Sequence, residues 1–200
     1  MIYFRSDYSQ GAHPKVMDAL VRTNLEHTDG YGLDEHCANG AKMIQEWIGD
    51  RDCQVYMMVG GTPCNLTFIA ASLKPYESVV SVRSGHIYSH ETGAVEATGH
   101  RITAMDGENG KLTPKQIDEA WKEYEDEHTL LPRMAYISQP TEIGTIYSRS
   151  EMIALREKCK ERGMILYVDG ARLGAALTCK DNDLSIEELA QLCDGFYIGG

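Results

Sequence analysis

The sequence lacks the features that mark membrane, secreted and nucleic-acid-binding proteins. No apolar run approaches the ~20 residues of a membrane-spanning helix, and the first residues lack the basic start and apolar stretch of a signal peptide. Basic residues are scarce, since 19 Lys and Arg stand against 30 Asp and Glu for a formal charge of −11. Because this charge opposes nucleic acid and anionic membranes, we expect neither as a partner. With no membrane run and no signal peptide in the sequence, we expect a cytoplasmic protein.

Cysteine motifs are also absent, because the six cysteines form no C-x-x-C pair. A domain of this length does not need disulfides for stability, so we interpret the cysteines as reduced packing residues. His36-Cys37 has no second ligand pair at zinc-site spacing. We therefore expect no metal site.

The chain does contain a repeated alternation of short apolar runs with amphipathic segments, starting near Gln54. Mostly apolar runs of three to five residues fit strands that helices cover on both faces. The expected strands are Val55–Val59, Val79–Val82, Ile102–Met105, Met134–Ser138, Ile165–Val168 and Phe196–Ile198. This pattern predicts an α/β fold, with a mostly parallel sheet flanked by helices, over residues 54–200.

Helical spacing of apolar residues predicts the helices around this sheet. We expect one helix over Pro114–Glu127 and another that contains Met152 and ends before Gly163. Similar spacing over His36–Ile48, followed by Gly49, predicts a helix before the first strand. Residues 1–53 therefore form a short helical amino-terminal segment.

The turn Gly60-Gly61-Thr62-Pro63 follows an expected strand and opens an expected helix that runs to about Leu73. Thr62 suits the N-cap position and Pro63 the first helical turn. The free N–H groups of such a helix start bind phosphate, and glycines let the backbone approach it closely. The turn is also common as plain architecture, so alone it leaves both interpretations open. The motifs of nucleoside-triphosphate and dinucleotide loops are absent.

A second motif, Tyr167-Val168-Asp169-Gly170-Ala171-Arg172, places an acid at the carboxyl end of a buried strand. Open α/β sheets carry their chemistry at this edge. Asp169 there could keep a pyridinium nitrogen protonated, and Arg172 could bind a neighbouring phenolate oxygen. A buried ion pair between the two residues is the structural alternative.

Five motifs together resemble, in order and spacing, the threonine aldolase and aromatic amino acid β-eliminating lyase family of fold-type-I pyridoxal-phosphate enzymes. They are Phe4-Arg5-Ser6-Asp7, Asp29-Gly30-Tyr31-Gly32-Leu33-Asp34, Gly60-Gly61-Thr62-Pro63-Cys64-Asn65, His86-Ile87-Tyr88-Ser89-His90-Glu91-Thr92-Gly93-Ala94 and Val168-Asp169-Gly170-Ala171-Arg172-Leu173.

The resemblance implies a cofactor site for pyridoxal phosphate. Gly61 and Thr62 would bind its phosphate, His86 would stack on its ring, Asp169 would meet the ring nitrogen, and Arg172 the phenolic oxygen. For His86 the alternative is a loop histidine that bonds backbone.

The resemblance also implies substrate contacts and an oligomer. Ser6 would face the substrate carboxylate, while Tyr31 and Asp34 would lie near a neighbouring subunit's site in a homodimer or homotetramer. A tight Gly-Tyr-Gly turn is the alternative for Tyr31. His90, Glu91 and His100 are interpreted as structural.

Two departures from the family pattern affect the predicted reaction. Where family aldolases carry Asn-Thr-His-Asn, this chain reads Gln139-Pro140-Thr141-Glu142-Ile143, so Glu142 would replace a histidine near the substrate β-hydroxyl. A carboxylate can also act as a base there. The family's Schiff-base lysine is missing from these 200 residues, and we expect the polypeptide to continue, with a lysine within about ten residues of Gly200.

The prediction is therefore a pyridoxal-phosphate-dependent lyase that cleaves a carbon–carbon or β-bond of a small amino acid. An aminotransferase or racemase on the same scaffold is the nearest alternative, since the cofactor supports each reaction. A non-catalytic α/β protein that binds another phosphorylated ligand is the alternative from a different class.

Overall fold

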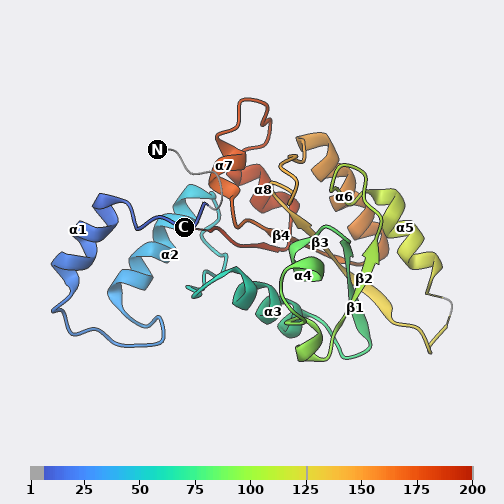
Figure 1. Ribbon diagram of the computed structural model, residues 1–200, viewed down its shortest axis with the longest axis horizontal. Helices are drawn as coiled ribbons and strands as arrows, with labels where there is room; N and C mark the ends of the chain where they lie inside the picture. Colours follow the sequence, from blue (N-terminus) through green and yellow to red (C-terminus); the bar gives the residue numbers. More distant parts are fainter. Residues whose placement is uncertain (1–6, 125, 200) are drawn as a thin grey trace. The chain divides into compact units, whose positions relative to one another are not determined.

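A computed structural model describes residues 7–124 and 126–199 of the chain. The chain divides into two compact units, Met1–Ala41 and Lys42–Gly200. Figure 1 shows the course of the chain through both units. The first unit contains helix α1 (Pro14–Thr23), and helix α2 (Glu35–Trp47) begins in it and runs across the division. The expected boundary at residue 53 stays a prediction.

The α2 helix begins where the sequence provides a cap. The Asp34 carboxylate accepts a hydrogen bond from the Cys37 backbone N–H at 2.9 Å, and this bond lowers the pKa of Asp34. Gly49 lies just beyond the helix with φ +69°, a conformation that favours glycine and stops the helix. The expected helix over His36–Ile48 is confirmed.

The second unit is built on a five-stranded sheet in the order β2-β1-β3-β4-β5, in which every neighbouring pair is parallel. Its strands are β1 (Glu77–Val82), β2 (Arg101–Met105), β3 (Leu131–Ser138), β4 (Ile165–Asp169) and β5 (Gly195–Phe196). Its remaining helices are α3 (Gly61–Ser72), α4 (His86–Ser89), η1 (Glu96–Thr98), α5 (Pro114–Lys122), α6 (Arg149–Arg162), α7 (Leu173–Leu177) and α8 (Ile186–Leu192). The predicted α/β class is confirmed.

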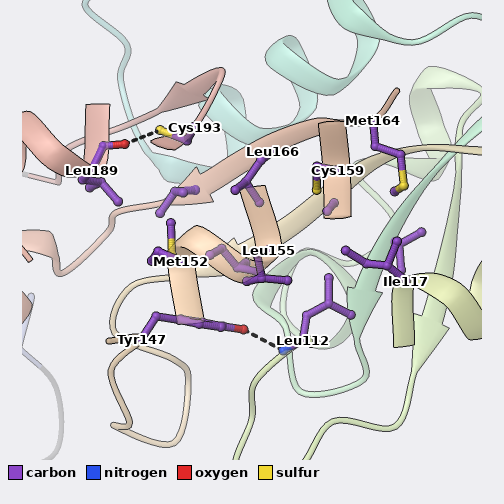
Figure 2. Packing of buried hydrophobic residues seen from close by; sticks show 14 of the residues in the cluster. Leu112, Ile117, Tyr147, Met152, Leu155, Cys159, Met164, Leu166, Leu189 and Cys193 are labelled. Atoms are coloured by element: carbon purple, nitrogen blue, oxygen red, sulfur yellow. Dashed lines mark hydrogen bonds between the residues drawn. The ribbon is translucent and has the colours of Figure 1, made fainter. Parts of the chain in front are cut away.

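Each face of the sheet has its own apolar core, because successive strand side chains point to opposite faces. The larger core packs alternate residues of β1, β3 and β4 against α5, α6 and α8, and Figure 2 shows part of it. Leu155 and Leu166 are fully buried there, and the Tyr147 hydroxyl accepts a hydrogen bond from the Leu112 backbone N–H.

The smaller core lies on the opposite face and packs the other strand residues against α3 and α4. Its strand residues include Tyr136 and Tyr167, which are buried with their hydroxyl groups. Buried hydroxyl groups need hydrogen-bond partners, so this face has to contain other polar groups.

Local signals explain most helix ends. Ser148 and Glu151 form a capping box at the start of α6, and Gly163, with φ +63°, ends that helix where the sequence predicts. The α5 helix ends at Lys122, earlier than the expected Glu127. The reason is the acidic run from Glu123, because negative charge is unfavourable at the carboxyl end of a helix dipole.

Three further expectations need correction. Val55–Val59 is not a strand; it pairs with no strand among residues 7–124 and 126–199, and its N–H and C=O groups therefore lack the partners that define one. Thr62 is not an N-cap, because Gly60 occupies that position with extended backbone and Gly61 is already helical. The strand expected over Phe196–Ile198 is a strand only at Gly195–Phe196. Backbone hydrogen bonds continue from Tyr197 N–H to the Val168 carbonyl and from Gly199 N–H to the Gly170 carbonyl, but Ile198 has no strand residue opposite it because β4 ends at Asp169.

In the described part of the chain, no helix combines the length and apolar character needed to cross a membrane.

Candidate active site

Polar side chains gather at the carboxyl ends of the parallel strands. Asp169 is the last residue of β4, Ser138 is the last residue of β3, and His86 opens α4 just after β1. The carboxyl ends of parallel strands lie at the same edge of a sheet. These residues therefore lie at one edge although they are far apart in the sequence.

Asp169 is 3% exposed, and both of its carboxylate oxygens accept hydrogen bonds. The Tyr136 hydroxyl donates at 2.5 Å and Asn65 Nδ2 at 3.1 Å to Oδ2, while the Ala171 N–H donates at 3.0 Å to Oδ1. Burial, the Asp169 charge and this hydrogen bond raise the pKa of Tyr136 well above its usual range. Tyr136 therefore stays a hydroxyl donor, and the site holds a buried carboxylate.

Tyr197 connects Asp169 to the start of α3. Burial, the charge of Asp169 and a hydrogen bond to it raise the pKa of Tyr197 far above its usual value. A Cβ added at Gly61 would lie 2.5 Å from the Tyr197 hydroxyl oxygen, so only glycine fits this position without displacing a neighbour. The helix start at Gly61 is thus adjacent to the group that bonds Asp169.

His86 joins the same network through Glu91. His86 Nδ1 and Glu91 Oε1 are 2.7 Å apart, and Asn65 Nδ2 donates to the same oxygen at 2.7 Å. Ligand atoms of His86, Glu91 and Asp169 all lie within 4.8 Å of one another, a grouping that could also hold a metal ion. Glu91 Oε1 and Asp169 Oδ2 already accept hydrogen bonds from Asn65, which favours a hydrogen-bonded network over a metal site.

The start of α3 has the character expected of an anion site. Gly60 is its N-cap and offers no side chain to cap the first N–H groups, while Gly61 and Thr62 form the first helical positions. Pro63 lies in this first turn, as the sequence predicts.

The remaining predicted residues are dispersed. Arg172 is exposed and is the N-cap of α7, three residues after Asp169. Glu142 is half-buried after β3 and accepts a hydrogen bond from Ser138 Oγ at 3.3 Å. It lines a narrow crevice together with Tyr136, whose hydroxyl bonds Asp169.

The predicted substrate residues belong to the first unit or to its undescribed start. Ser6 lies outside the described residues. Tyr31 is fully exposed with φ +63° next to Gly32 with φ +77°, as in a tight turn. The roles of Ser6 and Tyr31 stay predictions.

Comparison with known proteins gives this geometry a family. Residues 3–200 match the family described as beta-eliminating lyase. The chain belongs to this family. Its members depend on pyridoxal phosphate, and three features of the site fit such a group. They are the buried Asp169 carboxylate, the His86 imidazole that is hydrogen-bonded to Glu91, and the start of α3 at Gly60, where no side chain caps the first N–H groups.

Individual relatives agree. The low specificity L-threonine aldolase of Pseudomonas aeruginosa is 33% identical over 187 residues, which is 91% of this chain and 54% of that protein. A solved threonine aldolase from Leishmania major is 43% identical, with a TM-score of 0.95 over 96% of this chain and 56% of that one. An aromatic aminotransferase from Pyrococcus horikoshii, 17% identical with a TM-score of 0.62 over 88% of this chain and 46% of that one, shares the fold. The chain spans about half the length of the curated relatives it matches.

Sequence reasoning missed most of the residues that connect the site. Asn65 and Glu91 lie inside two of the five motifs, but the sequence assigns no role to Asn65 and predicts a structural one for Glu91. Tyr136 and Tyr197 lie within apolar strand segments, where a tyrosine is usually a packing residue. One feature of the sequence could have identified these tyrosines. Both lie within three residues of the carboxyl end of a strand, which is the edge where α/β sheets carry their functional residues.

Proposed function

We propose that this protein is a pyridoxal-phosphate-dependent lyase that cleaves a small β-hydroxy amino acid in the manner of a threonine aldolase. The carrying observation is the buried Asp169 carboxylate at the end of β4, joined through Asn65 and Glu91 to His86. When bound, pyridoxal phosphate supplies an electron sink for the carbanion formed at the amino-acid α-carbon.

The chain's own groups would make this sink effective. Asp169 holds the proton on the pyridine nitrogen, because a buried carboxylate favours a positive partner in a water-poor site. The first N–H groups of α3, at Gly61 and Thr62, bind the phosphate, and Arg172 binds the phenolic oxygen. His86 covers one face of the ring. The smaller core keeps water from the Asp169 side.

Glu142 is the group assigned to the substrate β-hydroxyl. A base that takes the proton from this hydroxyl promotes cleavage of the Cα–Cβ bond, so threonine yields glycine and acetaldehyde. Loss of a β-substituent is the competing outcome on the same scaffold. We prefer carbon–carbon cleavage over loss of a β-substituent because the relatives of this chain include threonine aldolases.

The same proposal includes a homo-oligomeric, cytoplasmic enzyme. Its acidic charge of −11 suits a protein that binds neither nucleic acid nor anionic membranes. Ser6 and Tyr31 are the assigned contacts to the amino-acid substrate.

The experiment uses the full-length protein with added pyridoxal phosphate. We expect a visible absorption band that borohydride abolishes, together with release of acetaldehyde and glycine from threonine. Serine and an amino acid with a β-leaving group, assayed for formaldehyde and for pyruvate, separate the two bond cleavages. A Glu142→Gln variant should lose threonine cleavage with the absorption band unchanged. A protein without the band, or one that only transfers the amino group to a keto acid, contradicts the proposal.

A further inference from the structure

A buried amide connects the two carboxylates of the site. Asn65 is completely buried in the second turn of α3, and its Nδ2 donates to Glu91 Oε1 at 2.7 Å and to Asp169 Oδ2 at 3.1 Å. Its Oδ1 accepts from the Tyr167 hydroxyl at 3.2 Å. The opposite orientation would point the amide oxygen at both carboxylates, so the partners fix the side chain in one arrangement.

Glu91 is enclosed on every side. Its side chain is 0% exposed, and its Oε1 lies 2.7 Å from both Asn65 Nδ2 and His86 Nδ1. Its Oε2 has no hydrogen-bond partner among residues 7–124 and 126–199. Burying a carboxylate is unfavourable, and an apolar side chain would fill the same space at lower cost. A buried carboxylate beside an imidazole therefore indicates a role other than packing.

The shared oxygen decides which atom carries the proton. Glu91 Oε1 accepts a hydrogen bond from Asn65, and an ionised carboxylate only accepts hydrogen bonds because it has no proton to donate to the imidazole. His86 Nδ1 is therefore the donor, and the neutral ring keeps its lone pair on Nε2.

We propose that Glu91 and Asn65 are positioning residues that hold the His86 ring in its Nδ1–H tautomer and in one orientation, coupled to Asp169. The contribution of Glu91 and Asn65 to catalysis rests on the proposed function, because only a His86 ring that stacks on the cofactor has to be held in a fixed orientation. The tautomer itself does not depend on any cofactor. The His86 side chain is 36% exposed, so packing alone leaves its ring freedom to turn.

The tautomer can be read directly from the full-length protein labelled with ¹⁵N. Multiple-bond ¹H–¹⁵N spectra distinguish Nδ1–H from Nε2–H rings, and a His86→Gln sample identifies the signal of the His86 ring. Without cofactor at a pH of about 8.5, where a histidine ring is ordinarily neutral, we expect Nδ1–H in the wild type. The same form should persist in Glu91→Gln, which keeps an acceptor oxygen, and should change to Nε2–H in Glu91→Leu. Glu96→Gln, an exposed residue on η1, is the matched control and should change nothing.

Kinetics test the catalytic half of the inference. With threonine and saturating pyridoxal phosphate, Glu91→Leu should lower kcat/KM on the order of 100-fold, as expected when a reacting group is misplaced. Glu91→Gln should lose about 10-fold or less, which is partial rescue by the conservative variant.

Three outcomes overturn the inference. The first is an Nε2–H ring in the wild type, a result that does not depend on either Glu91 variant. The second is a Glu91→Leu protein that keeps both the Nδ1–H ring and its kcat, even if it is less stable, because Glu91 would then only support the fold. The third is an equal kinetic loss in Glu91→Leu and Glu91→Gln with the tautomer unchanged in both. A wild type that turns over no amino acid contradicts the proposed function instead, and the tautomer result remains decisive for this pair.

Discussion

The two faces of one sheet differ in what their side chains do. In β4, Leu166 and Val168 point into the larger core, where neighbours are almost all apolar. Tyr167 points to the opposite face, into the smaller core, and its hydroxyl bonds Asn65. A strand of five residues therefore contributes both to an apolar core and to a polar network that ends at Asp169. The difference predicts that substitutions on one face cost stability and those on the other cost turnover.

The largest effect is expected on the polar side. Asp169→Ala in the full-length protein should bind pyridoxal phosphate through the helix start near Gly61, yet lower turnover about 10³-fold or more, because charge stabilisation in an enclosed site is lost. Steady-state threonine cleavage measures it, with exposed Asp181→Ala as the control. Near-native turnover would mean that Asp169 is structural and that the comparison fails.

The next effect belongs to the larger core. Leu155 is 1% exposed on α6, and Leu155→Ala should lower the free energy of unfolding by about 2–5 kcal/mol through the cavity it leaves. Turnover by the folded fraction should stay within a few-fold of wild type. Urea unfolding and kinetics on the same sample test both statements, with Ile153→Ala, 36% exposed on the same helix, as a nearly neutral control. A large loss of turnover in folded Leu155→Ala would remove the distinction between the faces.

A smaller effect tests the close contact between Tyr197 and Gly61 at the start of α3. Gly61→Ala places a methyl group 2.5 Å from the Tyr197 hydroxyl oxygen and should cost about 1–3 kcal/mol of stability. The cost should fall when the same change is made in Tyr197→Phe, because the nearest atom is gone. Gly60→Ala is the control, since a Cβ there meets its nearest atom, Pro63 Cδ, at an ordinary 3.8 Å. Equal costs in both backgrounds would show that Tyr197 does not restrict Gly61.

The smallest effect concerns the outer surface over the larger core. Asp118 on α5 bonds Arg162 and Lys158 of α6, and these hydrogen bonds lower the pKa of Asp118 below 3.8. Asp118→Asn should cost about 0.2–1 kcal/mol near neutral pH. Because a lowered folded-state pKa stabilises above the unfolded value, the difference from wild type should vanish as the pH falls through the lowered pKa. Urea midpoints at pH 7 and near pH 3 measure this, and a difference that grows with acidity would contradict it.

The sequence predicted those parts of the molecule whose signals are local. Gly163 and Gly49 stop their helices where expected, and Asp169 ends its strand at the functional edge. The contacts of Asn65 could not be read in this way, since its bonds to Glu91 and Asp169 span 26 and 104 residues. Such pairs depend on the order of the strands, which apolar runs do not encode.

The strand that was predicted wrongly shows a different limit of the sequence pattern. Val55–Val59 has the composition of a buried strand, yet Tyr56 is 77% and Val59 98% exposed. Strand formation depends on a paired neighbour as well as on propensity. The sequence pattern records only propensity.

The most direct test of the central claim is the ¹⁵N chemical shift of the ring nitrogen of labelled pyridoxal phosphate bound to the full-length protein. If Asp169 holds the proton there, the wild type should show the shift of a protonated pyridinium, and Asp169→Ala the shift of a neutral pyridine with the cofactor still bound. A neutral ring nitrogen in the wild type, or a protonated one in both proteins, would contradict the role of Asp169.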